Sequence, residues 1–150
     1  RIHERRGYRS RDPGRQKWGL TVNIVLDTNV LVSALWSPSN KPAAIINAVL
    51  SRKFTVCYDY RILDGYTKVL HRPKFAFSEW EIQYLLDAII KNGISIIADP
   101  ISDAPFPDES DRKFYEVAKY CFALLITGNT RHYPQDASII TVSDFYERFL

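Results

Sequence analysis

The sequence predicts an α/β fold, a three-layer α/β/α sandwich with a mainly parallel central sheet, and three observations lead to this prediction. Short apolar runs typical of buried strands alternate along the chain with segments whose apolar residues recur at helical spacing. Capping residues, glycines and prolines separate these segments. The chain of 150 residues is long enough for one such domain and too short for two of full size. Strands that alternate with helices form parallel sheets covered by helices on both faces.

The first expected elements follow one another closely. Asn23–Asp27 is an apolar run that ends on an acid, which is typical of a buried strand. Thr28–Trp36 carries apolar residues at helical spacing. A second helix is expected at Pro42–Leu50, because proline favours the first turn of a helix. Phe54–Tyr58 is rich in β-branched and aromatic residues and predicts the second strand.

The middle of the chain predicts two more helices with clear ends. Asp59 occupies the position of a helix N-cap, and Pro73 ends the helix that follows it. Ser78 and Glu81 have the spacing of a capping box, in which each side chain binds a backbone N–H of the other residue. The helix that they open is expected to run to about Asn92, before a glycine that favours a helix end.

The last elements complete the alternation of strands and helices. Ile94–Ala98 predicts a strand, Asp108–Phe122 a helix with one apolar face, and Ala123–Thr127 a further strand. A shorter strand at Ser138–Val142 and a helix at Ser143–Leu150 end the chain.

The positive charge of the chain is concentrated at one end. The net charge is +3, but residues 1–20 alone hold seven basic and two acidic side chains, a net charge of +5. Residues 21–150 hold 13 basic and 15 acidic side chains, a net charge of −2. We therefore expect a basic N-terminal extension at 1–20 and a folded domain at 21–150. Such an extension can bind phosphate groups, remain a solvated tail, or pack on a second subunit.

Several classes of protein are excluded by what the sequence lacks. The longest apolar run, Cys121–Ile126, is far shorter than the ~18 residues of a membrane helix, so no membrane association is expected. The chain has no glycine-rich phosphate-binding loop, and its histidines show no metal-ligand spacing. Cys57 and Cys121 lie in apolar stretches and are expected to be free thiols, which suits a cytoplasmic protein.

Acidic and amide side chains gather where the strands of the expected sheet end. Asp27 closes the first strand, and Asp108 and Asp111 open the helix that leads into the fourth strand. Asn129 follows that strand. Ligands of parallel sheets bind beyond the carboxyl ends of the strands, where the winding direction reverses. Oxygen ligands without histidine or cysteine partners suit Mg²⁺ or Mn²⁺, ions that assist phosphodiester hydrolysis.

Four segments of the chain resemble the PIN domain family in order and in spacing. They are Ile24–Leu35, Val69–Phe75, Asp108–Phe114 and Leu125–Asn129. The resemblance extends from about Val22 to Leu150. The opening segment is more narrowly similar to the VapC-like branch, whose members are toxins of toxin–antitoxin pairs. The resemblance implies a three-layer α/β/α fold and a metal-dependent ribonuclease.

The resemblance also implies the residues of an active site. Asp27 and Asp111 match two of the family's metal-holding acids, and Asp108 matches the companion acid just before the second of them. Asn129 stands where the family usually has aspartate, and its amide oxygen can still accept a hydrogen bond from a metal-bound water. These four residues form the expected catalytic set, with Asp27 and Asp111 as the metal ligands.

Three further residues are expected to support this set. Thr28 and Asn29 match polar residues that orient the first acid, and Thr127 lies beside the metal site. Gly65 falls where the family usually has a glutamate, and it cannot ligate an ion.

Ordinary helix chemistry offers an alternative for each acid. Asp27 can cap the helix that follows it, a role compatible with catalysis. Asp108 and Asp111 have capping-box spacing, although Asp111 shares the helix face expected to point toward the sheet.

A neighbouring acid, Asp64, could replace the missing glutamate at position 65. However, Arg61, Asp64 and Lys68 have the spacing of a solvated salt-bridge stripe, which favours a surface position for Asp64.

Two functions are compatible with these features. The first is an endoribonuclease that uses Mg²⁺ or Mn²⁺, acts on RNA as the toxin of a toxin–antitoxin pair, and forms a homodimer. The alternative is a degenerate PIN domain that binds RNA or a protein partner without cleavage, because Gly65 and Asn129 replace two acids.

Overall fold

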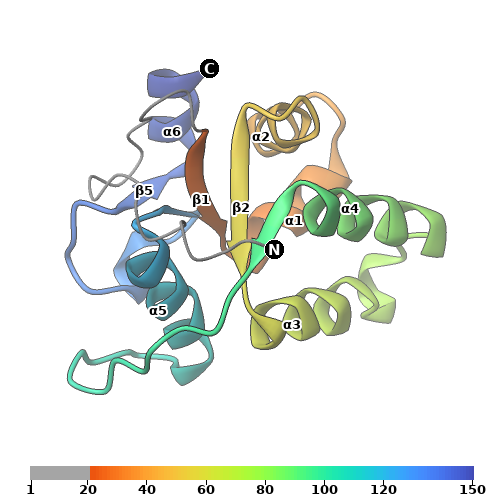
Figure 1. Cartoon of the computed structure of the whole chain (residues 1–150). Coiled ribbons are helices and arrows are strands. Elements are labelled where there is room, and N and C mark those ends of the chain that lie inside the picture. The colour runs from red at the N-terminus through yellow and green to blue at the C-terminus, as the bar shows by residue number, and fades with distance from the viewer. Residues whose placement is uncertain (1–20) are drawn as a thin grey trace.

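The computed structural model describes residues 21–150, and its centre is a five-stranded sheet (Figure 1). The strands are β1 (Val22–Leu26), β2 (Phe54–Tyr58), β3 (Gly93–Ser95), β4 (Leu124–Thr127) and β5 (Ile139–Thr141). Their order in the sheet is β3-β2-β1-β4-β5, and every neighbouring pair is parallel. The predicted parallel α/β architecture is confirmed. The expected basic extension at 1–20 lies outside the described residues.

Six α-helices surround the sheet. They are α1 (Thr28–Trp36), α2 (Lys41–Leu50), α3 (Tyr60–Leu70), α4 (Glu79–Lys91), α5 (Arg112–Cys121) and α6 (Val142–Phe149). Helix α5 packs on β1, β2 and β4, and Figure 1 shows α2 and α4 on the other side of the sheet. Helices α1 and α6 also contact β4, and α3 contacts both α1 and α5. The sheet is therefore the middle of three layers.

The predicted helix caps are present. The side chain of Asp59 accepts a hydrogen bond from the Ile62 backbone N–H at the start of α3. Ser78 and Glu81 form the reciprocal hydrogen bonds of a capping box at the start of α4. Each of these side chains satisfies a backbone donor that has no partner inside the helix.

Several element boundaries shift by one residue from the sequence prediction, and two differ more clearly. The third strand ends at Ser95 rather than Ala98, although the Ile96 N–H still donates to the Tyr58 carbonyl. Helix α5 begins at Arg112 rather than Asp108, and a 3₁₀ turn at Glu109–Asp111 precedes it. The physical reason is that the Asp108 side chain binds the Ser110 backbone N–H, which closes a tight turn ahead of the helix.

The core is continuous across the layers. All five residues of β1 are buried, as expected for a central strand covered on both faces. Tyr66 of α3 is also buried, and its hydroxyl donates to the Leu26 carbonyl at 2.6 Å. None of the helices in residues 21–150 combines the length and the apolar character that crossing a bilayer requires.

The order of the strands creates one special position. The chain runs from β1 to β2 and β3 on one side, then returns to place β4 on the other side of β1. The connections on the two sides of the β1–β4 pair therefore run in opposite directions along the sheet. Parallel sheets have their ligand-binding crevice at this position, beyond the carboxyl ends of the two strands. The residues that follow β1 and β4 face this crevice.

Candidate active site

Asp27 follows β1 directly, and two hydroxyl groups hold its carboxylate. The register pairs Leu26 with Ile126, which brings Asp27 beside Thr127. The Thr127 hydroxyl donates to Asp27 Oδ2 at 2.8 Å, and the Tyr133 hydroxyl donates to the same oxygen at 3.0 Å. Asp27 is only 7% exposed and stands at the N-cap of α1, yet its side chain forms no capping hydrogen bond. Its carboxylate is thus held by β4 and the connection after it rather than used by the helix.

Tyr133 is a part of this arrangement that sequence reasoning missed. It lies after a short 3₁₀ turn (Thr130–His132) between β4 and β5 and is buried. Burial, reinforced by the charges of Asp27 and Asp111, raises the pKa of its hydroxyl far above the usual value. The hydroxyl therefore remains a hydrogen-bond donor to Asp27. No periodicity marks this tyrosine, because it belongs to an irregular connection.

Thr28 and Asn29, the expected orienting residues, take positions on the first turn of α1. Thr28 is partly exposed and Asn29 is exposed. Within residues 21–150 the side-chain hydrogen bonds to Asp27 come from Thr127 and Tyr133. The orienting role thus falls to the β4 side of the crevice, where the expected supporting residue Thr127 is fully buried.

Asp111 is the second acid beside this crevice, and it has an unsatisfied buried atom. Its side chain is 14% exposed, and among residues 21–150 its Oδ2 has no hydrogen-bond donor. Burial raises the pKa of this carboxyl, and the charges of Asp27 and Asp108 raise it further. A buried acceptor without a donor is costly, and two nearby acids add repulsion. A cation between the carboxylates would remove both costs.

His132 approaches the same carboxylate from the turn after β4. Its Nδ1 lies 3.4 Å from Asp111 Oδ2, and its Nε2 lies 3.0 Å from the Asn129 amide nitrogen. The Asn129 amide can donate to Nε2 when the neutral ring carries its proton on Nδ1. Asn129 therefore positions His132 next to Asp111. Sequence reasoning missed His132, because its contact depends on how the turn folds back.

Asp108 lies at the rim of the site. Its Oδ1 accepts hydrogen bonds from the Ser110 hydroxyl at 2.8 Å and the Ser110 N–H at 2.9 Å. These hydrogen bonds lower the pKa of the Asp108 carboxyl. Its capping role is thus visible, and the exposed carboxylate stays ionised beside the crevice.

Gly65 and Asp64 lie on α3 as the sequence suggests, with one correction. Asp64 is 58% exposed and pairs with Lys68 at 2.9 Å, which confirms its surface position. Arg61 does not join that stripe: it pairs with Asp59 at 2.7 Å and with buried Glu116 of α5 at 2.8 Å. The stripe prediction is wrong for Arg61, because two buried carboxylates attract the guanidinium more strongly than an exposed one does.

The residues at the crevice suit one hard divalent cation. Mg²⁺ and Mn²⁺ are commonly held by one or two carboxylates together with water molecules. Asp27 and Asp111 could supply such a pair, and Asp111 Oδ2, which has His132 nearby but no hydrogen bond, fits a cation ligand. In the part of the chain described, no group of three or more His, Cys, Asp or Glu side chains is placed to hold an ion.

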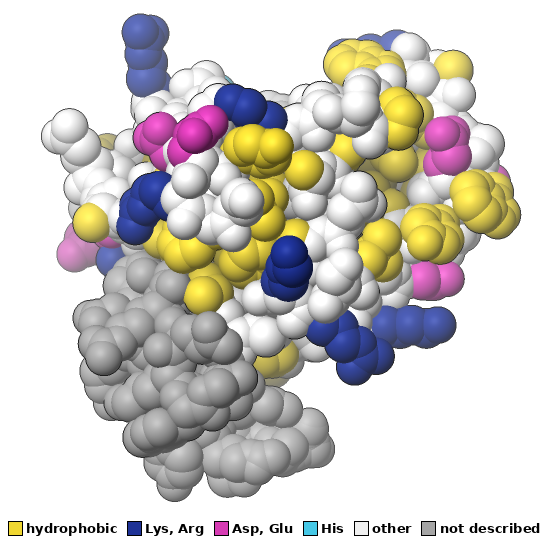
Figure 2. Space-filling model, turned by 90° about the horizontal axis from the view of Figure 1, so that it is seen from above, with side chains coloured by type: hydrophobic (Ala, Val, Ile, Leu, Met, Phe, Trp, Pro, Cys, Tyr) yellow, Lys and Arg dark blue, Asp and Glu magenta, His cyan; other side chains and the backbone are white. Residues whose placement is uncertain are grey.

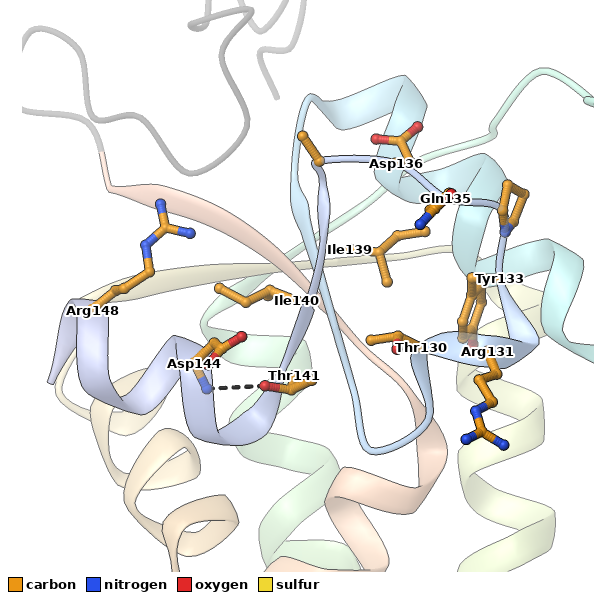
Figure 3. Close-up of a pocket in the computed structure, with 12 residues that line it drawn as sticks. Thr130, Arg131, Tyr133, Gln135, Asp136, Ile139, Ile140, Thr141, Asp144 and Arg148 are labelled. Carbon is orange, nitrogen blue, oxygen red and sulfur yellow. Dashed lines mark hydrogen bonds between the residues drawn. The ribbon is translucent and has the colours of Figure 1, made fainter.

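A pocket of about 700 Å³ lies next to this site, along β5 (Figure 3). Tyr133 lines the pocket while its hydroxyl binds Asp27, so the pocket and the acidic crevice share one side chain. Arg131 and Arg148 stand at different sides of the pocket in Figure 3. Elsewhere charges are mixed: on the face seen in Figure 2, hydrophobic, basic and acidic side chains alternate over the described residues.

Comparison with known proteins agrees with this geometry. Residues 23–131 match the model of the PIN domain family. The chain is also similar to the uncharacterized protein MJ1680 of Methanocaldococcus jannaschii, with 30% identity over 114 residues. That alignment covers 73% of this chain and 72% of the archaeal protein. The matched family region contains Asp27, Asp111 and Thr127, and it ends just before His132 and Tyr133. The chain belongs to the PIN domain family, which has a nuclease-type fold.

Proposed function

We propose that this chain is a metal-dependent endoribonuclease that hydrolyses RNA phosphodiesters. One observation supports the proposal: in a PIN domain, the charge of Asp27 acts on Asp111, whose buried Oδ2 has no hydrogen-bond donor among residues 21–150. Neighbouring acids that are partly buried destabilise the folded protein, and such groups with shifted pKa values are typical of functional sites.

Asp27 and Asp111 would hold Mg²⁺ or Mn²⁺, with Asp108 and Asn129 at the rim. A divalent cation held there supplies positive charge, which stabilises a phosphodiester under attack and makes water a better nucleophile. Thr127 and Tyr133 occupy Asp27 Oδ2 and leave Oδ1 for another partner. These two hydroxyls fix the carboxylate before any substrate arrives, which is the positioning that hydrolysis requires.

The reaction proposed for these residues is in-line hydrolysis. The oxygen of water bonds to phosphorus as the bond to the 3′-oxygen breaks, and the leaving oxygen gains a proton. The products are a 3′-hydroxyl and a 5′-phosphate. No covalent enzyme intermediate is needed, because the site contributes charge and orientation.

The decisive experiment measures RNA cleavage in Mn²⁺ or Mg²⁺, with a chelator as the blank. Asp27→Asn keeps the size of the side chain and removes its charge. We expect cleavage to fall at least about 100-fold, because even indirect changes around metal ligands cost 10- to 100-fold. Asp64→Asn is the matched control, since Asp64 is an exposed aspartate paired with Lys68. Undiminished cleavage by Asp27→Asn would contradict the proposal.

A second candidate function is a degenerate PIN domain that binds RNA or a protein without cutting. The observation that favours it is the absence of carboxylates at Gly65 and Asn129. Mn²⁺ titration separates the two candidates. The binding module predicts RNA binding with no Mn²⁺ bound at millimolar concentration, whereas the nuclease predicts Mn²⁺ binding that Asp27→Asn abolishes.

The biological role that we propose is the toxin of a toxin–antitoxin pair, acting as a homodimer in the cytoplasm. The opening segment Ile24–Leu35 supports this role by its likeness to VapC-like toxins. Exposed Trp80 and Tyr84, stacked on α4, add an apolar surface of the kind that protein partners cover. Expression in a bacterial host tests the role. Growth arrest that Asp27→Asn relieves supports a toxin, and normal growth with a cleavage-active chain contradicts it.

A further inference from the structure

Lys113 has an unusual place at the edge of the site. It lies in the first turn of α5, two residues after Asp111, and it is partly buried. Its stem passes over Gly65 of α3: a Cβ added at Gly65 would lie 3.5 Å from Lys113 Cε. No other heavy atom lies within 4 Å of that point apart from the helix's own backbone and chain neighbours. Position 65 and the lysine stem are therefore close neighbours, at an ordinary contact distance.

The ammonium of Lys113 has donors to spare. Its Nζ donates to the Ser110 carbonyl, and within residues 21–150 no carboxylate forms an ion pair with it. Burial lowers the pKa of Lys113, and the charges of Asp111, Asp27 and Asp108 oppose that shift. An ammonium has three donors, and a partly buried one is expected to find an anion.

The other cation near Lys113 is already engaged. Arg61 donates to Asp59 through Nε and to Glu116 through Nη1, both at 2.8 Å. Apart from His132 beside Asp111, the site presents the carboxylates of Asp27, Asp108 and Asp111. Residues 21–150 carry a net charge of −2. An RNA strand that approaches Asp27 and Asp111 would be repelled unless a cation receives its phosphate. Lys113 lies at this edge, and among residues 21–150 no carboxylate forms an ion pair with its ammonium.

We propose that the Lys113 ammonium binds a phosphate oxygen of an RNA strand beside Asp27 and Asp111. This inference deepens the proposed function and rests on its RNA substrate. Lysine binds phosphate as a compact point charge, so the contact needs reach rather than a fixed orientation. Position 65 lies beside the lysine stem, so a charge placed there would act on the ammonium.

The test measures binding of a fluorescein-labelled oligouridylate by anisotropy in chelator, over a series of salt concentrations. Lys113→Met is expected to weaken binding severalfold and to reduce the slope of log K against log salt by about 0.7, the value for one phosphate contact on a single strand. Lys113→Arg is expected to retain both affinity and slope. Lys68→Met removes the same charge from an exposed position on α3 and is expected to change neither.

Position 65 gives a second, independent test of the same contact. Gly65→Glu would place a carboxylate beside the Lys113 stem and pair with the ammonium, so RNA binding should weaken as in Lys113→Met. Gly65→Gln has the same size without the charge and should bind RNA as the unchanged protein does. Thermal unfolding of each variant verifies that the fold is intact.

Two outcomes overturn the inference. One is unchanged affinity and salt slope in Lys113→Met together with tighter Mn²⁺ binding by electron paramagnetic resonance, which would make Lys113 a neutralising partner of the carboxylates. The other is no measurable oligouridylate binding by the unchanged protein at low salt. The binding assay contains no metal and is therefore independent of cleavage. RNA binding that depends on Lys113, together with no cleavage in the separate Mn²⁺ or Mg²⁺ assay, would contradict the endoribonuclease and leave the Lys113 contact standing.

Discussion

Asp111 shows how a single residue can be unfavourable for stability and useful for chemistry. Its buried Oδ2 has no donor among residues 21–150, and Asp27 and Asp108 add negative charge. Ordinary buried carboxylates are paired or hydrogen-bonded. Active sites commonly keep such costs because the missing partner arrives with the ligand.

We expect Asp111→Asn to raise the free energy of unfolding at pH 7 in metal-free buffer. The pKa of Asp111 is raised in the folded state, so the folded protein holds that proton more tightly than the unfolded chain does. The contribution of this carboxyl to stability is therefore present at low pH and lost as the pH rises through the raised pKa. Denaturant unfolding with and without chelator measures the difference, with Asp64→Asn as the control.

Mn²⁺ should make the unchanged protein more stable than Asp111→Asn, the reverse of their order in metal-free buffer. A ligand that binds only the folded state adds about 2.7 kcal/mol at 100 times its dissociation constant. The unchanged protein should gain this stability from Mn²⁺, and Asp111→Asn should gain much less. Equal Mn²⁺ stabilisation of both proteins would remove Asp111 from the metal site.

At the scale of elements, one ion-pair network joins α3, α5 and the loop before α5. Arg61 of α3 pairs with Asp59 and with Glu116 of α5, which is 4% exposed. The other Glu116 oxygen accepts from the Ile101 backbone N–H at 2.8 Å. The network fixes α5 against α3, and so it fixes the distance between the helices that carry Lys113 and Gly65.

Arg61→Met should lower the free energy of unfolding by about 3 kcal/mol, because it leaves two buried carboxylates without their cation. Urea unfolding at pH 7 measures the loss. The double variant Arg61→Met with Glu116→Gln should recover part of it, since the second change removes the unpaired charge. A loss below about 0.5 kcal/mol would show that Arg61 behaves as a surface residue.

The sequence predicted the helices and their caps correctly, but it did not predict this ion-pair network. Capping at Asp59 and at Ser78 and Glu81 depends on residues within one turn, and the sequence predicted all of it correctly. The pair between Arg61 and Glu116 joins residues 55 positions apart, and helical spacing gave Arg61 the wrong partner. Periodicity describes neighbours on one helix and contains no information on what a second helix brings to them.

At the scale of the whole molecule, the edge strand β5 depends on a charged connection. Asp136, just before β5, accepts hydrogen bonds from Lys119 of α5 and from Ser138. Burial acts against ionisation, but the hydrogen bonds from Lys119 and Ser138 outweigh it and lower the pKa of Asp136 to about 2. This carboxylate therefore ties the end of the sheet to the helix layer.

Asp136→Asn should destabilise the domain by about 2 kcal/mol at pH 7. A depressed pKa contributes stability that is present above the unfolded-state value and lost as the pH falls through the folded-state value. The difference between the two proteins should therefore shrink between about pH 4 and pH 2. Thermal unfolding across this range measures it, with exposed Asp87→Asn on α4 as the control. A difference independent of pH would show that packing, rather than charge, stabilises the connection.

The sequence by itself determined the order of the elements, the caps, and the placement of Asp27 and Thr127 at strand ends. These features depend on local spacing and on the rule that parallel strands end at one edge. Only the tertiary structure decided which side chains lie next to the acids, namely Tyr133 on Asp27 and His132 beside Asp111. It also decided that Lys113 lies over Gly65. The physical reason is that these contacts cross between layers and irregular turns, where no period in the sequence fixes the distance.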